Sequence, residues 1–300
     1  MRKYYAKLRQ REKIVHRRAE RMAERRRIIL RSLRYLLLAA LILVLGYSFL
    51  VEPRIVRVVE HDVPIKGLPW AFDGFTVVQV SDVHVGVFIR PKGVRRLVAR
   101  VNAFQPDLIL LTGDYVNRVR KNIEPAGRAL RGLRARYGVY AVLGNHDYWA
   151  DAPRMTRALQ KSKIDVLFDE KRKIALGKDV IWVVGTDDVW EGKPDYEKAF
   201  AGVPDDAICL VMAHNPDAAL SLGGKPVSLL LSGHTHGGHV NLPWIGPVLT
   251  ATELGPKYAS GMHEFRGIKL YVSPGVGSAT PLRFRCPPEF TVFTLRRAER

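Results

Sequence analysis

The sequence predicts an α/β fold that follows a single N-terminal transmembrane helix. Beyond residue 70, apolar runs rich in β-branched residues alternate with helix-like segments, which is the order of an α/β domain. Five of these runs end in a cluster of polar residues, and an uncharged run over 35–51 precedes the domain. Only two cysteines occur, Cys209 and Cys286, so at most one bridge can form and a disulfide framework is excluded.

Residues 1–34 form a strongly basic arm. They hold 14 Lys and Arg against 3 Glu, which supplies +11 of the formal net charge of +19. The basic composition is therefore mainly a property of the N-terminus. Because an adjacent membrane anchor and anionic lipid headgroups account for this charge, we do not expect a nucleic-acid partner.

The uncharged run from Tyr35 to Val51 is dominated by Leu, Ile, Val and Ala. At 1.5 Å per residue it spans roughly 26 Å, slightly short of a hydrocarbon core of about 30 Å, and Arg31 and Arg34 can extend it by snorkelling. We predict a retained signal anchor. The alternatives are a buried core helix, which is rarely apolar on every side, and a signal peptide cleaved at a weak small-residue site over 46–48.

The basic arm also predicts the orientation of the chain. Basic residues that precede a span stay in the cytoplasm, so residues beyond 51 are expected outside it. The expected organisation is a cytoplasmic arm over 1–34, an anchor over 35–51 in the cytoplasmic (inner) membrane, and an extracytoplasmic domain over 52–300. Residues 26–31 also resemble a twin-arginine export signal, which would let the domain fold before export.

Five continuous apolar runs are predicted as buried strands, with helices expected over 91–104 and 124–135. The runs cover 75–80, 108–111, 139–143, 208–212 and 227–231. Loops at the carboxyl ends of strands in an open α/β sheet share one crevice, so the polar clusters after these runs should meet in one site. They contribute Asp82, His84, Asp114, Asn145, His146, His214, His234 and His236.

The chemistry of this set favours a pair of divalent metal ions. Imidazole, carboxylate and amide groups without a thiol suit Mn, Fe, Zn or Co. Seven such ligands exceed what one catalytic ion takes, so two ions that share a carboxylate are expected. Singly, the Asp-x-His and Gly-Asp pairs are common in caps and turns, and the Asn of Gly-Asn-His-Asp can be a turn residue. The combination, in this order after strands, is what indicates a metal site.

These motifs resemble those of the calcineurin-like metallophosphoesterase superfamily. In order they are Asp82-Val83-His84, Gly113-Asp114, Gly144-Asn145-His146-Asp147, His214 and Gly233-His234-Thr235-His236. The resemblance covers roughly residues 70–295, and the segment 275–289 is similar to small bacterial membrane-associated or exported phosphodiesterases. It implies a four-layer α/β/β/α sandwich of two mixed sheets, which the strand pattern alone does not distinguish from one doubly wound sheet.

The resemblance also implies a role for each residue. One ion would be held by Asp82, His84, Asp114 and His236, and Asp114 would bridge to a second ion held by Asn145, His214 and His234. A hydroxide that bridges the ions would attack phosphorus, and His146 would be catalytic, stabilising the transition state or protonating the leaving oxygen.

Two positions depart from the family pattern. Asn117 stands where many relatives carry a carboxylate that supports the catalytic histidine. An amide stabilises a protonated imidazole less than a carboxylate does, so His146 is expected to be less effective as a proton donor than in those relatives. His239 stands where a glutamine is expected, and we predict that it lines the substrate pocket.

The substrate is less well defined by the sequence. An apolar loop over 241–249 follows the last metal motif, and with a bilayer nearby it suggests a phosphorylated lipid or lipid-linked pyrophosphate, with Trp244 at the interface. Packing of this loop on the domain itself is the alternative. Arg283 is a further candidate for phosphate binding. The expected function is a membrane-anchored phosphodiesterase or pyrophosphatase; the alternatives are a nuclease of the same superfamily, a dimetal amidohydrolase or a non-catalytic metal-binding scaffold.

Overall fold

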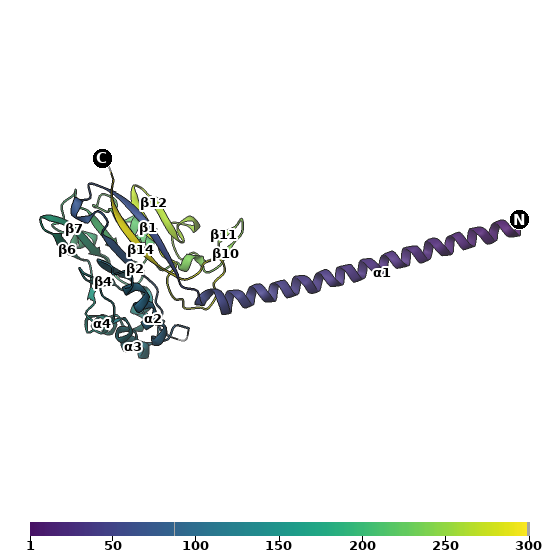
Figure 1. Ribbon diagram of the computed structural model, residues 1–300, viewed down its shortest axis with the longest axis horizontal. Coiled ribbons are helices and arrows are strands. Elements are labelled where there is room, and N and C mark those ends of the chain that lie inside the picture. Colours follow the sequence, from purple (N-terminus) through teal and green to yellow (C-terminus); the bar gives the residue numbers. More distant parts are fainter. Residues whose placement is uncertain (87, 299–300) are drawn as a thin grey trace. The chain divides into compact units, whose positions relative to one another are not determined.

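The computed structural model describes residues 1–86 and 88–298, and the chain divides into two units. The first, Met1–Tyr47, consists almost entirely of the helix α1 (Arg2–Gly46). The second, Ser48–Arg300, contains every strand of the described chain (Figure 1). In the described part of the chain, one helical segment, Arg2–Arg54, is long and apolar enough to cross a membrane.

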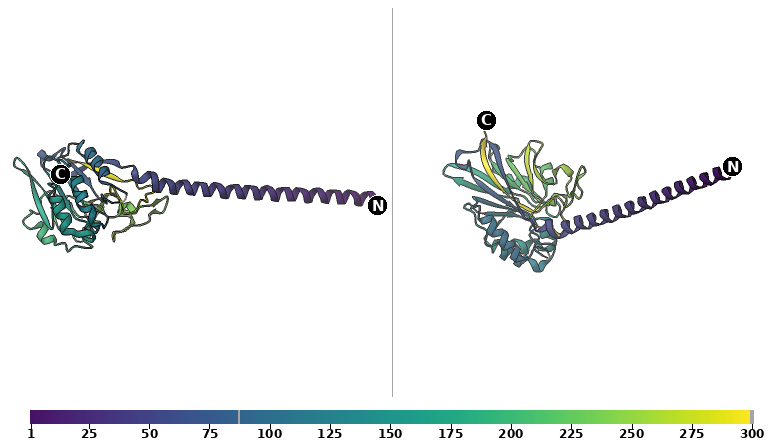
Figure 2. Two further views of the ribbon diagram at one scale, coloured as in Figure 1. Left: turned by 90° about the horizontal axis from the view of Figure 1, so that it is seen from below. Right: turned by 45° about the vertical axis from the view of Figure 1, so that its right-hand side comes forward.

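Two six-stranded mixed sheets form the centre of the second unit (Figure 2). In spatial order the first sheet contains β1 (Arg57–Lys66), β14 (Glu289–Ala298), β2 (Thr76–Val80), β3 (Leu108–Thr112), β4 (Val139–Val142) and β5 (Asp165–Val166). The second contains β12 (Gly261–Phe265), β13 (Ile268–Val272), β9 (Leu229–Ser232), β8 (Cys209–Met212), β7 (Asp179–Gly185) and β6 (Glu170–Leu176). A separate short pair joins β10 (Asn241–Leu242) to β11 (Gly246–Pro247).

The strands that carry the polar clusters run parallel within each sheet. In the first sheet β2, β3 and β4 are parallel neighbours, whereas β14 runs antiparallel to β2. In the second sheet β8 and β9 are parallel. Parallel strands present their carboxyl ends at the same edge, so the loops that follow them can converge.

Helices cover the outer face of each sheet. The first sheet packs against α2 (Pro91–Asn102), α3 (Ile123–Leu130) and α4 (Asn145–Gln160), and the second against α5 (Tyr196–Phe200) and a 3₁₀ turn over Pro216–Leu220. Three apolar cores separate the four layers. The predicted four-layer α/β/β/α sandwich is therefore confirmed.

Alternate residues of the central strands enter different cores. In β2, Val78 and Val80 face the helical layer while Val77 faces the other sheet, and in β9 Leu230 lies on the outer face while Leu229 and Leu231 face inward. Successive strand residues point to opposite faces, so a strand buried on both faces must be apolar throughout. This explains the continuous apolar runs. The two predicted helices and five predicted strands are confirmed by α2, α3, β2, β3, β4, β8 and β9.

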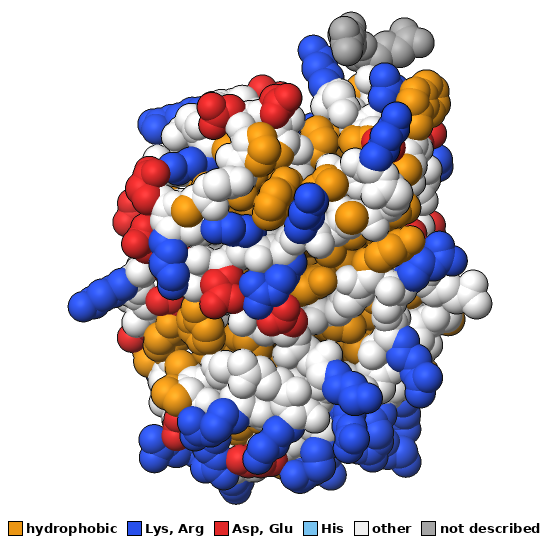
Figure 3. All heavy atoms as spheres, turned by 90° about the vertical axis from the view of Figure 1, so that its left-hand side faces the viewer, with side chains coloured by type: hydrophobic (Ala, Val, Ile, Leu, Met, Phe, Trp, Pro, Cys, Tyr) orange, Lys and Arg blue, Asp and Glu red, His pale blue; other side chains and the backbone are white. Residues whose placement is uncertain are grey.

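Basic side chains are not confined to the N-terminal arm. Figure 3 shows Lys and Arg crowding the lower end of one face of the molecule, the end at which Figure 1 draws α2, α3 and α4. The two cysteines, Cys209 and Cys286, are both buried and free, so they do not form a bridge.

The compact unit begins at Ser48, before the expected domain boundary at residue 52. The Ser48 carbonyl accepts a hydrogen bond from Arg283 N at 3.0 Å. The buried Glu52 carboxylate accepts from the backbone N–H groups of Arg285 and Cys286 at 3.0 and 2.6 Å. The end of the apolar run is thus joined to the segment 283–286 of the folded domain.

Substitution of Glu52 should destabilise this domain. Glu52→Ala leaves the buried N–H of Cys286 and the partly buried N–H of Arg285 without an acceptor, which costs about 2 kcal/mol and should lower Tm by roughly 4–8 °C. Thermal unfolding of the full chain in detergent, followed by circular dichroism, measures this loss. Glu60→Ala, at an exposed position in β1, is the control and should leave Tm within about 1 °C of the wild type; equal Tm values for the two variants would contradict the role of Glu52.

Candidate metal centre

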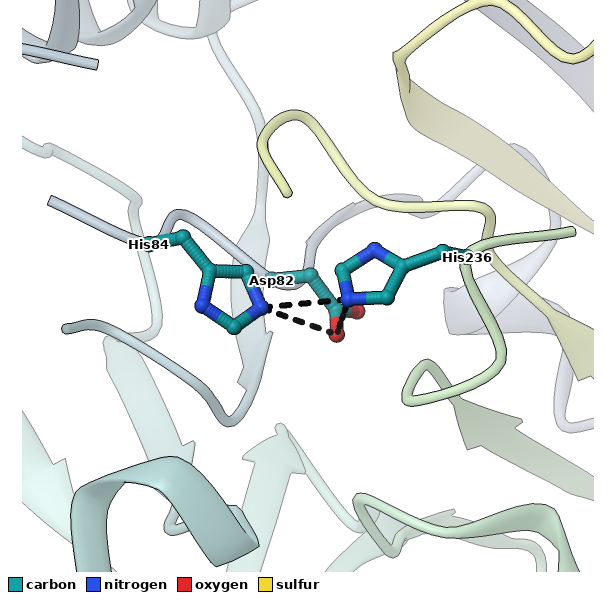
Figure 4. Close-up of side chains that lie close together, drawn as sticks. All are labelled: Asp82, His84 and His236. Atoms are coloured by element: carbon teal, nitrogen blue, oxygen red, sulfur yellow. Dashed lines mark hydrogen bonds and ion pairs between the residues drawn. The ribbon is translucent and has the colours of Figure 1, made fainter. Parts of the chain in front are cut away.

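Three predicted ligands from opposite ends of the domain sequence meet at one point. Asp82 and His84 follow β2, and His236 follows β9. The Nε2 atoms of His84 and His236 lie 3.2 Å apart, and Asp82 Oδ1 lies 3.9 and 3.7 Å from them (Figure 4). All three residues are buried. Their ligand atoms are close enough to hold one metal ion.

A second group forms beside the first, from two further loops and from the loop that also carries His236. Asn145 begins α4, His214 follows β8 and His234 follows β9. Asn145 Oδ1 lies 3.2 Å from His214 Nε2 and 3.0 Å from His234 Nδ1, and these two ring nitrogens are 3.2 Å apart. One amide oxygen and two imidazole nitrogens therefore converge, as ligands around a cation do.

The carboxylate of Asp114 lies between the two groups. Its Oδ2 atom is 3.4 Å from His84 Nε2 and 3.3 Å from His214 Nε2, so a single oxygen adjoins both sets of ligands. The structure therefore brings together all seven residues that the sequence analysis predicts as ligands, arranged as two sets that share one carboxylate.

The candidate ligands differ in the hydrogen bonds of their rings. His214 Nδ1 lies 2.7 Å from the Thr112 carbonyl, and a donor at Nδ1 makes Nε2 the nitrogen that would bind a metal. Nδ1 of both His84 and His236 is buried without a partner in the described part of the chain. Close N···N pairs without an intervening donor fit lone pairs that point at a cation, so the donor set fits two divalent ions.

Burial keeps most of these imidazoles in the neutral form that binds metals. It lowers the pKa of His84 and of His234 to about 3. Burial would also raise the pKa of Asp114, but attraction to His214 and His84 outweighs it and holds that pKa well below its usual range. Burial would lower the pKa of His214 in the same way, but attraction to Asp114 outweighs it and holds that pKa well above its usual range. A metal requires neutral imidazoles and an ionised carboxylate, so metal binding at His214 would release a proton.

The ligands occupy sharp turns of the backbone. The φ angles of Asp82, Asp114 and His234 are 54°, 59° and 71°, in the left-handed region that residues with a side chain rarely adopt. Such strain is concentrated at functional sites. Two glycines permit the close approach: a Cβ at Gly144 would lie 2.3 Å from Asp114 Oδ1, and one at Gly233 would lie 2.2 Å from Asp82 Oδ2. These glycines belong to the Gly-Asn-His and Gly-His motifs.

Asp147 supports the shared carboxylate, a role that the sequence analysis does not assign. Its Oδ2 atom accepts from the backbone N–H groups of Asp114 and Gly144 at 2.9 and 3.1 Å. Its Oδ1 atom accepts from those of Tyr115 and Val116 at 2.9 and 3.3 Å. The fully buried Asp147 thus fixes the turn that carries Asp114. Its place directly after Asn145-His146 is the sequence signal that would have identified it.

His146 is half-buried at the edge of the metal ligands. Its backbone N–H donates to Asp114 Oδ1 at 2.9 Å, and its ring lies 4.7 Å from the ring of His84. Nδ1 is buried without a partner in the described structure, because Asn117 donates to the Ala279 carbonyl at 3.5 Å rather than to this ring. The amide at position 117 therefore does not orient His146.

The ligands open into a cleft of about 530 Å³. Its wall includes Trp149 and Trp190, both partly exposed, and Arg118, whose guanidinium lies 3.8 Å from the centre of the Trp149 ring. The Trp190 ring lies 4.2 Å from that of His234. None of these three residues is predicted from the sequence. Trp149 lies one helical turn after His146, which is the signal that could have placed it.

The three predicted substrate-binding residues differ in position. His239 lines the cleft, with its ring 4.8 Å from that of His236. Trp244 is fully exposed and does not line the cleft, although Val248 and Leu249 of the same loop do.

Arg283, the third of these residues, is completely buried rather than placed to bind phosphate at the surface. Its guanidinium donates to four backbone carbonyls at 2.5 to 3.3 Å, those of His236, Pro274, Gly277 and Cys286. A buried guanidinium is stable here because carbonyl oxygens replace its water. Arg283 therefore does not bind phosphate at the surface. It stabilises the loop that carries the candidate ligand His236.

Comparison with known families identifies the fold and chemistry. The profile of the calcineurin-like phosphoesterases matches residues 75–238, which include all seven candidate ligands. The chain belongs to this family. It is therefore a phosphoric ester hydrolase, and the family uses divalent metal ions.

Three relatives indicate the range of named activities. The chain is 31% identical to phosphodiesterase YaeI of Escherichia coli, over 83% of this chain and 92% of the relative. It is 30% identical to a transmembrane protein with metallophosphoesterase domain of Danio rerio, over 88% and 62%. It is 26% identical to the UDP-2,3-diacylglucosamine pyrophosphatase LpxG of Chlamydia trachomatis, over 84% and 93%.

Loss of the Asp147 carboxylate should weaken metal binding without removing a ligand. Asp147→Asn places a side-chain N–H donor opposite backbone N–H groups. Because the two donors repel, Asp114 is displaced, and metal affinity should fall about 10- to 100-fold. Competition with a chelator, monitored by metal analysis of the full chain, measures this change. Asp151→Asn, on the same helix and outside the cleft, should bind metal as the wild type does. Wild-type affinity in Asp147→Asn would disprove the supporting role.

Proposed function

We propose that this protein is a single-pass membrane phosphodiesterase or pyrophosphatase with two divalent ions in its active site. The single observation that carries this proposal is the position of Asp114 Oδ2 within 3.4 Å of an imidazole nitrogen from each ligand set. One ion would be held by Asp82, His84, His236 and Asp114. The other would be held by Asn145, His214, His234 and the same Asp114.

Bound ions would supply acidified water and positive charge for the phosphoryl oxygens. The protein contributes rigid, buried ligands and a cleft that orients the phosphoryl group in front of them. Pre-positioned charge of this kind requires no rearrangement during the reaction and is commonly the largest catalytic contribution. Arg118, exposed at the cleft wall, can pair with a second phosphoryl group.

His146 is proposed as the catalytic residue of the chain. Burial lowers its pKa, so its ring is neutral near pH 7 and carries one N–H. That N–H can donate a hydrogen bond to a phosphoryl or leaving oxygen as negative charge develops on it. The absence of a carboxylate partner on Nδ1 favours this hydrogen-bonding role over full proton donation by an imidazolium.

The substrate class follows from the surroundings of the cleft. Two tryptophans and the apolar side chains of Val248 and Leu249 line it, which suits a substrate with an apolar portion. YaeI is named as a phosphodiesterase, and LpxG is named for a diacylated sugar nucleotide. We therefore propose a phosphorylated lipid or lipid-linked pyrophosphate as substrate. His239 would contact it within the cleft, and Trp244 would lie at the membrane interface.

Activity and metal content should separate the roles of Asp114 and His146. The full chain in detergent with Mn²⁺ should hydrolyse bis-p-nitrophenyl phosphate. Asp114→Ala should lose both metal and activity, whereas His146→Gln should keep its metal and lose about 10²- to 10⁴-fold in kcat.

His263→Gln, outside the cleft, is the matched histidine control and should retain wild-type activity. Full diesterase activity in Asp114→Ala would refute the shared-carboxylate site. Metal-loaded protein that cleaves nucleic acids but not lipid phosphoesters would favour the nuclease alternative.

The proposed topology can be tested by labelling of introduced cysteines. The native cysteines are buried and should not react. Lys178→Cys, at the exposed turn between β6 and β7, should react with a membrane-impermeant maleimide in intact cells. Gln10→Cys, in the basic arm, should react only after lysis. The opposite pattern would place the catalytic domain in the cytoplasm.

A further inference from the structure

A second apolar depression lies outside the metal cleft. We call it the membrane-proximal groove, and it has a volume of about 520 Å³. Its apolar lining includes Phe88, Ile89, Leu97 and Val276. The Phe88 side chain is 51% exposed, although an aromatic ring is normally placed inside a domain. The groove shares no lining residue with the metal cleft, so its occupant need not be the substrate.

The rim of the groove is basic. Arg54, Arg90, Lys92, Arg96 and Arg100 line it, and no acidic side chain does in the described part of the chain. Two of them are held by backbone carbonyls: Arg100 donates to Val56 at 3.0 Å and Arg54 donates to Leu50. The other three, Arg90, Lys92 and Arg96, are exposed, and none forms an ion pair with a described residue. Basic side chains without an acidic partner beside an apolar surface are complementary to an anionic, amphipathic ligand.

The chain itself connects this groove to the predicted membrane anchor. A neighbouring cavity of about 280 Å³ shares Phe88, Arg90 and Arg54 with the groove and is also lined by Phe49. Phe49 belongs to the apolar run over 35–51 and to the folded unit that begins at Ser48. The lining of the groove includes Pro53, two residues after the end of that apolar run.

We infer that the membrane-proximal groove binds one anionic phospholipid of the bilayer. An acyl chain would lie along Phe88, Ile89 and Leu97, and the phosphate would pair with the guanidinium groups of Arg90 and Arg96. This inference rests on the proposed membrane anchoring but not on catalysis. The bound lipid would hold the domain against the membrane surface through a contact additional to the anchor. Apolar burial and charge pairing together give stable association where either alone is marginal.

Photocrosslinking in a bilayer tests the inference directly. The full chain is placed in nanodiscs of phosphatidylcholine that contain a trace of either phosphatidylglycerol or phosphatidylcholine with a diazirine in the same acyl chain. Labelled positions are then mapped by mass spectrometry. Phosphatidylglycerol should label the segment 88–97 at least about fivefold more than phosphatidylcholine, since each basic side chain near the surface favours an anionic lipid by about that factor.

Substitutions separate the groove from the basic arm, which also attracts anionic lipid. The double variant Arg90→Gln/Arg96→Gln should reduce the phosphatidylglycerol preference at 88–97 to about onefold while leaving hydrolysis of bis-p-nitrophenyl phosphate unchanged. Arg95→Gln, on the same helix but outside the groove, should keep the full preference.

Two other labelling patterns would overturn the inference, and they differ in what they say about the anchor. Labelling of 35–51 by both probes, with no preference at 88–97 in the wild type, would overturn the inference and leave the anchor intact. Absence of labelling over 35–51 by either probe would refute membrane anchoring itself, and the inference with it.

Discussion

The carboxylate of Asp114 is the point on which the arrangement of the domain depends. Its Oδ2 atom lies near imidazoles delivered by the loops after β2 and β8, which belong to different sheets. That is possible only if the carboxyl ends of both sheets meet at one edge. The carboxylate is held there by the left-handed backbone at Asp114 and by Asp147, which accepts hydrogen bonds from four backbone N–H groups. The cost of that strain is met by the buried network around it.

The central strands were predictable because they are buried on both faces, whereas the division into two sheets was not. Val77 and Val78 are both apolar, but one faces a sheet and the other faces helices. A continuous apolar run is the same in either case, so only the family resemblance indicated four layers. The strands β1 and β14 were missed because each has exposed residues and its partner lies at the other end of the domain.

The cluster of candidate metal ligands was predictable for a different reason, since the chemistry of its residues and their place after strands are local properties of the sequence. Arg283 shows where local information ends. Its burial depends on carbonyls of His236, Pro274 and Gly277, which only the folded loops bring together. An arginine near a phosphate site is expected to bind phosphate, but here the same donors stabilise backbone. Trp190 likewise reaches the cleft from a loop without a recognisable motif.

The same loops link the start of the folded unit to the metal site. Glu52 accepts from the backbone of Cys286, and both the Cys286 thiol and the Arg283 guanidinium donate to the carbonyl of the ligand His236. Ser48, within the apolar run, accepts from Arg283 N. Cleavage in the weak small-residue site over 46–48 would place a charged amino terminus beside this buried network, where desolvation of the charge is costly. The packing of Ser48 and Glu52 therefore argues against cleavage at this site, because this part of the chain supports the backbone of the candidate ligand His236.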